Sequence, residues 1–179
     1  MTGATYLNFD KALQTGMKLI RTHENPTAGL LIVVGINLGL RISDLLQLTY
    51  GDLRKDSIDI IEGKTKKKRK ITLNDNIKTA MRYFGEDAFN DSFHAFRSQK
   101  GTVYSNKHVN RLLTKYFSGN RVSSHSLRKT FGRRVWDNNN QSESALLYLS
   151  EMFAHKDIAT TRKYLGIRQE QIDDIYMNL

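Results

Sequence analysis

The sequence predicts a mostly helical α+β domain with a small antiparallel β-sheet of about three strands. Apolar residues recur at the three- and four-residue spacing of helices along most of the chain. Small polar residues that cap helices stand before most of these stretches. One isoleucine-rich segment alternates in part, which is typical of a strand. With 179 residues, 39% of them hydrophobic, and no cysteine, the chain is long enough to bury a core in one domain without disulfides.

Two long helices are expected at the start of the chain. Residues 8–23 carry apolar side chains at a helical spacing, which predicts the first helix. Asn25 can cap the second helix and Pro26 fits its first turn, because that turn does not need the amide hydrogen that proline lacks. The apolar run 28–38 forms the body of the second helix, and Gly39 is expected to end it.

A short helix, a hairpin and a longer helix are expected next. Ser43 begins the short helix, with the sequence SDLLQL. Residues 57–62 predict a strand, residues 70–73 its partner, and the lysine run between them the turn. A helix is then expected from Asp75 to about Phe84.

The second half of the chain is expected to be helical except for its first segment. Residues 96–103 predict a third short strand or a turn around Gly101. Helices are then expected over 106–117 with Ser105 as cap, from Ser124 or its neighbour through HSLRKTFGRRVW, from Ser142 to near Ala154 after an asparagine-rich loop at 138–140, from Asp157 to Gly166, and over 167–177.

The formal net charge of +10 favours a polyanionic partner, although a merely basic surface is the alternative. The distribution of charge is more informative, because six of the seven residues from Lys64 to Lys70 are basic. A second basic group lies in and around the string HSLR. Such side chains neutralise backbone phosphates and make binding salt-dependent. The candidates for contacts with a nucleic-acid backbone are Lys66, Lys67, Lys68, Arg69, Lys129 and Arg133.

The sequence also bears on the compartment. The N-terminal residues lack the basic flank and the apolar run of a signal peptide. The longest apolar stretch, 28–40, is interrupted by Gly35 and Asn37 and is too short to cross a bilayer. We therefore expect no membrane contact and take the cytoplasm as the default compartment.

Several residues that can act on a phosphate are scattered along the chain, and each also has an ordinary structural explanation. His125 and Arg128 are three residues apart and share a helix face, where the guanidinium can hold two phosphate oxygens and the imidazole can move a proton. The alternative is a basic surface. Arg41 lies beside a core segment and needs an anionic partner, which is either a phosphate or Asp44. The lysine run is a solvated loop unless one lysine points towards a site.

Taken singly, Tyr164 and His155 suggest a core tyrosine and a helix-capping histidine. The joint pattern is more specific. It consists of GLRISDL around Arg41, a lysine in the predicted β-turn, HSLR, and FAHKDIATTRKYL, in which a histidine stands nine residues before a tyrosine. This order resembles the tyrosine recombinases, the family of phage integrases and DNA invertases. FRSQKGTVYSNKHVNRLL also resembles that family, and the resemblance runs from roughly Ala28 to Gly166.

The resemblance implies an integrase-type catalytic domain that breaks and rejoins double-stranded DNA. Arg41 and Arg128 would clamp the non-bridging oxygens of the scissile phosphate and stabilise its crowded transition state. Tyr164 would be the nucleophile and would form a 3′-phosphotyrosyl link to the DNA. The bond energy held in that link would make rejoining possible without ATP.

The resemblance also assigns the proton transfers. His125 would assist proton transfer at the tyrosine, and His155, where some members have tryptophan, would hydrogen-bond or buttress the phosphate. Lys64 follows Gly63 at the end of the first strand, as in many members, and would protonate the departing 5′-oxygen, with Lys66 as its competitor. The arginines supply the positive charge, so neither a metal nor another cofactor is expected.

The resemblance sets the expected domain organisation. Residues 1–179 would be the catalytic domain, with 1–25 as an N-terminal helix or remnant and without the separate core-binding domain that most integrases carry. The chain would be an excised catalytic fragment or similar to the short single-domain invertases. Residues 167–179 carry an apolar stripe that packs within the molecule or docks on a neighbouring protomer. A tetramer on DNA and accessory DNA-bending proteins are the implied partners. Phe153–Ala154 departs from the usual Leu-Gly before the second histidine.

The leading hypothesis is a site-specific recombinase that integrates, excises or inverts mobile DNA, such as a phage. A type IB topoisomerase shares this chemistry, but the small size and the integrase-like strings argue against it. A DNA-binding remnant that no longer cuts is a second alternative, against which the intact set of six residues argues. In an unrelated basic helical DNA-binding domain, the positions of these residues would be a coincidence.

Overall fold

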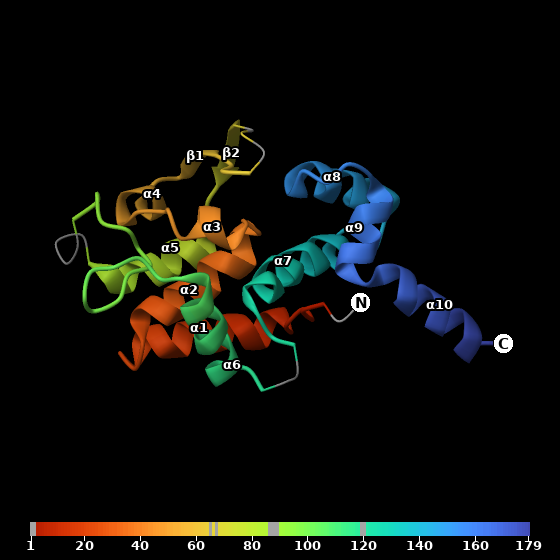
Figure 1. Cartoon of the computed structure of the whole chain (residues 1–179), viewed down its shortest axis with the longest axis horizontal. Coiled ribbons are helices and arrows are strands. Elements are labelled where there is room, and N and C mark those ends of the chain that lie inside the picture. Colours follow the sequence, from red (N-terminus) through yellow and green to blue (C-terminus); the bar gives the residue numbers. More distant parts are fainter. Residues whose placement is uncertain (1–2, 65, 67, 86–89, 119–120) are drawn as a thin grey trace.

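The computed structural model of the protein describes residues 3–64, 66, 68–85, 90–118 and 121–179 (Figure 1). It is mostly helical with one small antiparallel sheet, so the predicted α+β class is confirmed. In chain order the elements are α1 (Phe9–Arg21), α2 (Pro26–Leu38), α3 (Ile42–Leu45), α4 (Tyr50–Arg54), β1 (Ser57–Ile61), β2 (Lys68–Thr72), α5 (Asp75–Met81), the 3-10 helix η1 (Arg82–Phe84), α6 (Asn106–Tyr116), α7 (Ser124–Asn138), α8 (Glu143–Phe153), α9 (Ile158–Leu165) and α10 (Ile167–Met177).

Several helices begin where a polar side chain satisfies one of their first amide groups. Asn8, Asn25, Ser105, Ser142 and Asp157 each accept a hydrogen bond from the backbone N–H three residues later. The caps of α2, α6, α8 and α9 are those that the sequence predicts, whereas Asn8 is expected in the first helix but not specifically as its cap. The starts of these helices are therefore set by local sequence.

The short helix α4 is absent from the sequence prediction. The Thr49 hydroxyl accepts a hydrogen bond from the Asp52 amide, and the Asp52 carboxylate accepts one from the Thr49 amide, both at 3.1 Å. This capping box uses an aspartate in place of the usual glutamate or glutamine. The helix has five residues, which is too short for an apolar period to be visible in the sequence.

The sheet has two antiparallel strands in the described part of the chain, β1 and β2, paired from Ser57 with Thr72 to Ile61 with Lys68. The predicted third strand is instead a turn with a single bridge between Arg97 and Val103. The Ser98 amide donates to the Thr102 carbonyl at 2.8 Å, so the chain reverses too tightly for a longer ladder. The alternative prediction of a turn at this position is the correct one.

The apolar residues of the described structure form two clusters. The larger is centred on α2, which is buried from Ala28 to Ile36 and is covered by α1, α5 and the first half of α7. The smaller joins the second half of α7 to α8 and α9 and contains Trp136, Phe153 and Leu165. Figure 1 shows α8 and α9 side by side at one end of the molecule and α1 and α2 at the other.

Helix α7 belongs to both clusters. Leu127 lies in the larger one and Trp136 in the smaller one. A Cβ atom on Gly35 would lie 2.7 Å from Leu127 Cδ1, so the glycine allows α7 to approach α2 closely. Arg128, the next residue of α7, therefore lies where the two clusters meet.

Helix α10 follows directly on α9 and points away from the rest of the protein (Figure 1). Of the predicted apolar stripe, Ile175 is 62% exposed, Tyr176 75% and Leu179 96%. Packing within the molecule, the first alternative for this stripe, therefore does not account for these three side chains.

None of the described helices combines the length and the apolar composition that crossing a membrane requires.

Candidate active site

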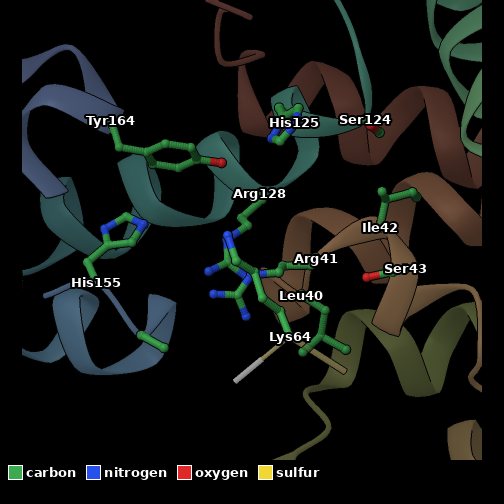
Figure 2. A pocket seen from close by; sticks show the side chains of 11 residues that line it. Leu40, Arg41, Ile42, Ser43, Lys64, Ser124, His125, Arg128, His155 and Tyr164 are labelled. Atoms are coloured by element: carbon green, nitrogen blue, oxygen red, sulfur yellow. The ribbon is translucent and has the colours of Figure 1, made fainter. Parts of the chain in front are cut away.

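All six predicted catalytic side chains line one cavity of about 410 Å³ (Figure 2). They come from distant parts of the sequence and from both apolar clusters. Arg41 precedes α3, Lys64 follows β1, His125 and Arg128 are on α7, His155 lies between α8 and α9, and Tyr164 is on α9. The fold thus brings together the residues that the sequence proposes.

Arg128 is held rigidly at the junction of the two clusters. Its side chain donates to the carbonyl oxygen of Gly39 at 3.0 Å and to that of Phe153 at 2.9 Å. The guanidinium also lies 4.3 Å from the centre of the Phe153 ring. Burial lowers the pKa of Arg128 to about 10, which still leaves it charged at neutral pH. Arg128 therefore offers a fixed positive charge to the cavity.

Arg41 is paired with a residue that the sequence analysis does not name. We expected Asp44 or a phosphate as its partner, but its guanidinium donates to the Glu62 carboxylate at 2.5 Å and to the Phe153 carbonyl at 3.0 Å. The other oxygen of Glu62, which is 1% exposed, binds Arg69 at 2.8 Å. Asp44 instead accepts a hydrogen bond from the Gly63 amide at 3.1 Å. One buried carboxylate thus orients Arg41 and fastens the hairpin.

Lys64 projects from the hairpin turn into the cavity (Figure 2). The turn is held at its base, because the Lys66 amide donates to the Glu62 carbonyl at 2.8 Å. Lys66, the competing candidate, has a left-handed backbone and an exposed side chain, and it is not among the described residues that line the cavity. Its neighbour Lys67 lies outside the described residues. The geometry therefore favours Lys64.

The Tyr164 hydroxyl is buried and has no hydrogen-bond partner among the described residues. Its ring meets those of Phe153 and His155 edge-on, with centroid distances of 5.6 and 5.3 Å, and Lys129 Nζ lies 5.1 Å from its centre. Burial raises the pKa of Tyr164, while the charges of Arg128 and Arg41 act against that rise. The hydroxyl thus lies beside concentrated positive charge, with the Arg128 guanidinium close enough to lower its pKa as a hydrogen-bond donor.

The two histidines are anchored differently. His125 is exposed in the first turn of α7, and the preceding Ser124 is fixed by α6: its amide donates to Asn110 Oδ1 at 2.8 Å and its hydroxyl to Asn106 Oδ1 at 2.7 Å. His155 is half-buried, with Nδ1 2.8 Å from the Thr161 hydroxyl. Burial lowers the pKa of His155, and the charges of Arg128 and Arg41 lower it further. The neutral form of His155 is therefore favoured in the free protein.

Two of the six candidates for DNA-backbone contacts are engaged elsewhere. Arg69 turns inward to Glu62 and also donates to the Met152 carbonyl. Arg133 forms an ion pair with Asp137 at 3.1 Å. Lys66 and Lys68 are exposed. Lys129 is half-buried beside Tyr164, and burial lowers its pKa.

Ala154, which stands where the Leu-Gly pattern has glycine, adopts the left-handed conformation that ends α8, with φ 50° and ψ 45°. Glycine adopts this conformation without strain, whereas an L-residue there costs about 1–2 kcal/mol. Because glycine is also freer in the unfolded state, we expect Ala154→Gly to raise the free energy of unfolding by about 1 kcal/mol. Urea denaturation measures this. Ala145→Gly, inside the same helix, is the matched control and is expected to lower stability.

No group of three or more histidine and acidic side chains among the described residues is arranged to hold a metal ion. The charged groups that face the cavity are Arg41, Lys64 and Arg128. The arrangement can therefore hold an anion against two adjacent guanidinium groups, with a hydroxyl, an ammonium and two imidazoles lining the same cavity.

Comparison with known proteins agrees with this geometry. Residues 12–171 match the profile of the phage integrase family. The chain is 31% identical over 146 residues to the probable integrase/recombinase YoeC of Bacillus subtilis, covering 78% of this chain and 77% of that protein. It is 28% identical to a tyrosine recombinase of Agathobacter rectalis, covering 78% of this chain but 47% of that protein. The chain thus spans about half the length of that relative.

Solved structures show the same fold. XerA recombinase superposes with a TM-score of 0.69 and 20% identity, covering 98% of this chain and 65% of that one. A lambda integrase dimer bound to a COC′ core site gives a TM-score of 0.64 and 16% identity, covering 91% of this chain and 47% of that one. The family profile covers most of the chain, and YoeC is 31% identical with 77% of its length covered. The protein therefore belongs to the phage integrase family.

Proposed function

We propose that this chain is the catalytic domain of a site-specific recombinase that cleaves and rejoins double-stranded DNA through a 3′-phosphotyrosyl intermediate. The observation that carries the proposal is the cavity that Tyr164 shares with Arg41, Arg128, Lys64 and the two histidines. The names of the relatives, which include integrases and tyrosine recombinases, support it. So does the net charge of +10.

The arginines would hold the scissile phosphate. An arginine has five N–H donors, and the bonds described for Arg128 use two of them on carbonyl oxygens. The others can bind the non-bridging oxygens, and Arg41, which donates to the same Phe153 carbonyl as Arg128, would bind the phosphate from beside it. Both guanidinium groups are oriented before the DNA arrives, so their charge stabilises the transition state without further reorganisation.

The cleavage step would exchange one phosphate ester for another. The Tyr164 oxygen bonds to phosphorus as the bond from phosphorus to the 5′-oxygen breaks, and the electron pair of that bond stays on the 5′-oxygen. Lys64 donates a proton to this oxygen, and the phenolic proton passes to His125. Attack by a 5′-hydroxyl on the phosphotyrosine reverses the step and rejoins the strand.

Covalent capture tests this function. The protein is incubated with fragmented DNA from its source, denatured and recovered, and the attached DNA is sequenced. Enrichment of one short sequence is expected and supports a recombinase. Attachment at all sequences favours the topoisomerase alternative. The absence of attachment, also on nicked substrates that trap the intermediate and with a longer protein, favours a DNA-binding remnant.

We further propose that the protein forms a homotetramer on DNA and that α10 docks on a neighbouring protomer in it. Ile175 and Tyr176 are exposed on this helix, and a partner surface would cover them. Deletion of residues 169–179 is expected to leave the melting temperature nearly unchanged and to abolish strand exchange and assembly on DNA. Circular dichroism measures the melting temperature, a gel shift measures assembly on DNA, and electrophoresis of the recombined DNA measures strand exchange. Unfolding of the truncated protein would mean that the helix belongs to the core.

A further inference from the structure

His155 stands at the end of a buried chain of hydrogen bonds. Its Nδ1 atom lies 2.8 Å from the Thr161 hydroxyl, which lies 2.8 Å from the Ser150 hydroxyl, which donates to the Leu146 carbonyl at 2.8 Å. Thr161 is 0% and Ser150 6% exposed. The chain connects α8 and α9 beneath the loop that carries His155 (Figure 2 shows the imidazole facing Tyr164).

The position of each proton in this chain follows from counting donors. A carbonyl oxygen has no hydrogen to give, so the single hydroxyl proton of Ser150 points at Leu146. Thr161 must then donate its own proton to Ser150. The Thr161 oxygen is left as an acceptor, so the bond to His155 requires a proton on Nδ1. A neutral imidazole carries one proton, and Nε2 therefore has none.

We propose that Thr161 and Ser150 are positioning residues that fix neutral His155 in the Nδ1–H tautomer, so that His155 binds a phosphate through Nε2 only after this nitrogen takes up a proton. The second half of the proposal rests on the proposed place of His155 at the scissile phosphate. A lone pair on Nε2 repels a phosphate oxygen, whereas an N–H at the same atom binds it. Phosphate binding at this site thus takes up one proton.

The charges around His155 set the pH range in which this proton is taken up. Arg128 on α7 and Arg41 before α3 disfavour the imidazolium, and Asp157 at the start of α9 favours it. Burial and these two arginines lower the pKa of His155 in the free protein. Lys64 and His125 line the same cavity, and the edge of the Tyr164 ring packs on the imidazole. A bound phosphate offsets the arginine charges and raises the pKa of His155.

Phosphate affinity is expected to fall as the pH rises. The His155 pKa is higher in the phosphate complex than in the free protein, so binding takes up a proton between the two values. The contribution of His155 to phosphate affinity is full below the lower pKa and is lost as pH rises through the higher one. Within that window the affinity falls by about tenfold per pH unit, as the linkage of one proton requires.

The tautomer can be measured directly by nitrogen NMR of the histidine rings in the free, ¹⁵N-labelled protein, with His155→Gln to assign the signals. At a pH above the His155 pKa, the wild type is expected to show a protonated Nδ1 and an unprotonated Nε2. Thr161→Ser keeps the hydroxyl and should keep this tautomer. Thr161→Val removes the acceptor and should give Nε2–H. A wild-type Nε2–H signal, or no change in Thr161→Val, would overturn the proposal.

Ser150→Ala provides a second variant that does not touch the imidazole. Without Ser150, the Thr161 hydroxyl can turn its proton towards His155 Nδ1, so the neutral ring should again shift to Nε2–H. A merely structural role for these hydroxyls would change the melting temperature without moving the tautomer. A Ser150→Ala protein that is folded and keeps the wild-type tautomer would contradict the proton order derived above.

Dimethyl phosphate is the probe for the proton uptake, because it keeps one negative charge across the pH range of interest. In the wild type its binding should protonate Nε2, with the pH dependence given above. In Thr161→Val the affinity should change less than about threefold per pH unit, since Nε2–H is already present. The same affinity profile in both proteins, or no binding near His155, would overturn the phosphate part. The tautomer needs no DNA, so its failure is distinguishable from a failure of the recombinase proposal.

Discussion

Replacing Tyr164 with phenylalanine is expected to abolish the covalent complex between protein and DNA while leaving non-covalent DNA binding unchanged. The substitution removes the oxygen that we propose as the nucleophile and nothing else. This hydroxyl is buried and makes no hydrogen bond of normal geometry in the described structure, although Arg128 lies close to it, so its loss should change the stability of the fold by less than about 1 kcal/mol. Denaturing electrophoresis of protein with labelled DNA measures the adduct, and a gel shift measures binding.

Tyr148→Phe and Tyr176→Phe are the matched controls, because these tyrosines are 63% and 75% exposed and lie outside the cavity. Both variants are expected to retain the adduct in full. An adduct that persists in Tyr164→Phe and disappears in one of the controls would move the nucleophile to that residue. Loss of binding together with the adduct would mean that Tyr164 acts in DNA recognition.

Replacing Glu62 with alanine is expected to produce the largest loss of stability among these variants. Its carboxylate, 1% exposed, balances Arg41 and Arg69, whose side chains are 21% and 19% exposed. Removal of one partner of a buried pair leaves uncompensated charge and costs about 3–5 kcal/mol, and we expect the lower end because both arginines reach some solvent. Glu62→Gln keeps the shape and should lose less.

Urea denaturation measures this effect, and an exposed ion pair supplies the comparison. Asp56 binds Lys78 at 2.6 Å but is 92% exposed, so Asp56→Ala is expected to change stability very little. Equal losses in the free energy of unfolding for Glu62→Ala and Asp56→Ala would show that the burial of Glu62 does not increase its contribution to stability. A folded Glu62→Gln protein should also cleave more slowly, since Arg41 loses the group that orients it.

The sequence predicts those features that depend on neighbouring residues. Caps such as Asn25 and Asp157, and the left-handed Gly39 and Gly166, lie where their local patterns place them. The six site residues are predicted by the resemblance to a family and not by local patterns. The fold brings all six to one cavity, where we propose their chemical roles. The five-residue helix α4 leaves too short a pattern to be recognised.

Glu62 shows why contacts between distant residues are difficult to predict from the sequence. Its partner Arg41 is 21 residues away and lies before α3, so the pairing depends on how the hairpin packs against that segment, which no local pattern specifies. A weak signal exists, because Ile58, Ile60 and Glu62 alternate along the predicted strand 57–62, so that the sequence places an acid on an apolar face. Asp44 is closer in the chain, and that proximity made it the expected partner.

The two apolar clusters have a consequence for the population of competent molecules. Arg41 and Lys64 belong to segments that pack on the larger cluster, the proposed nucleophile Tyr164 packs on the smaller one, and α7 is shared between them. Partial opening between such units takes less free energy than complete unfolding. The observed cleavage rate is therefore the intrinsic rate multiplied by the fraction of molecules in which the clusters are closed. A substitution at their junction can lower that fraction, and hence the rate, while the melting temperature stays the same.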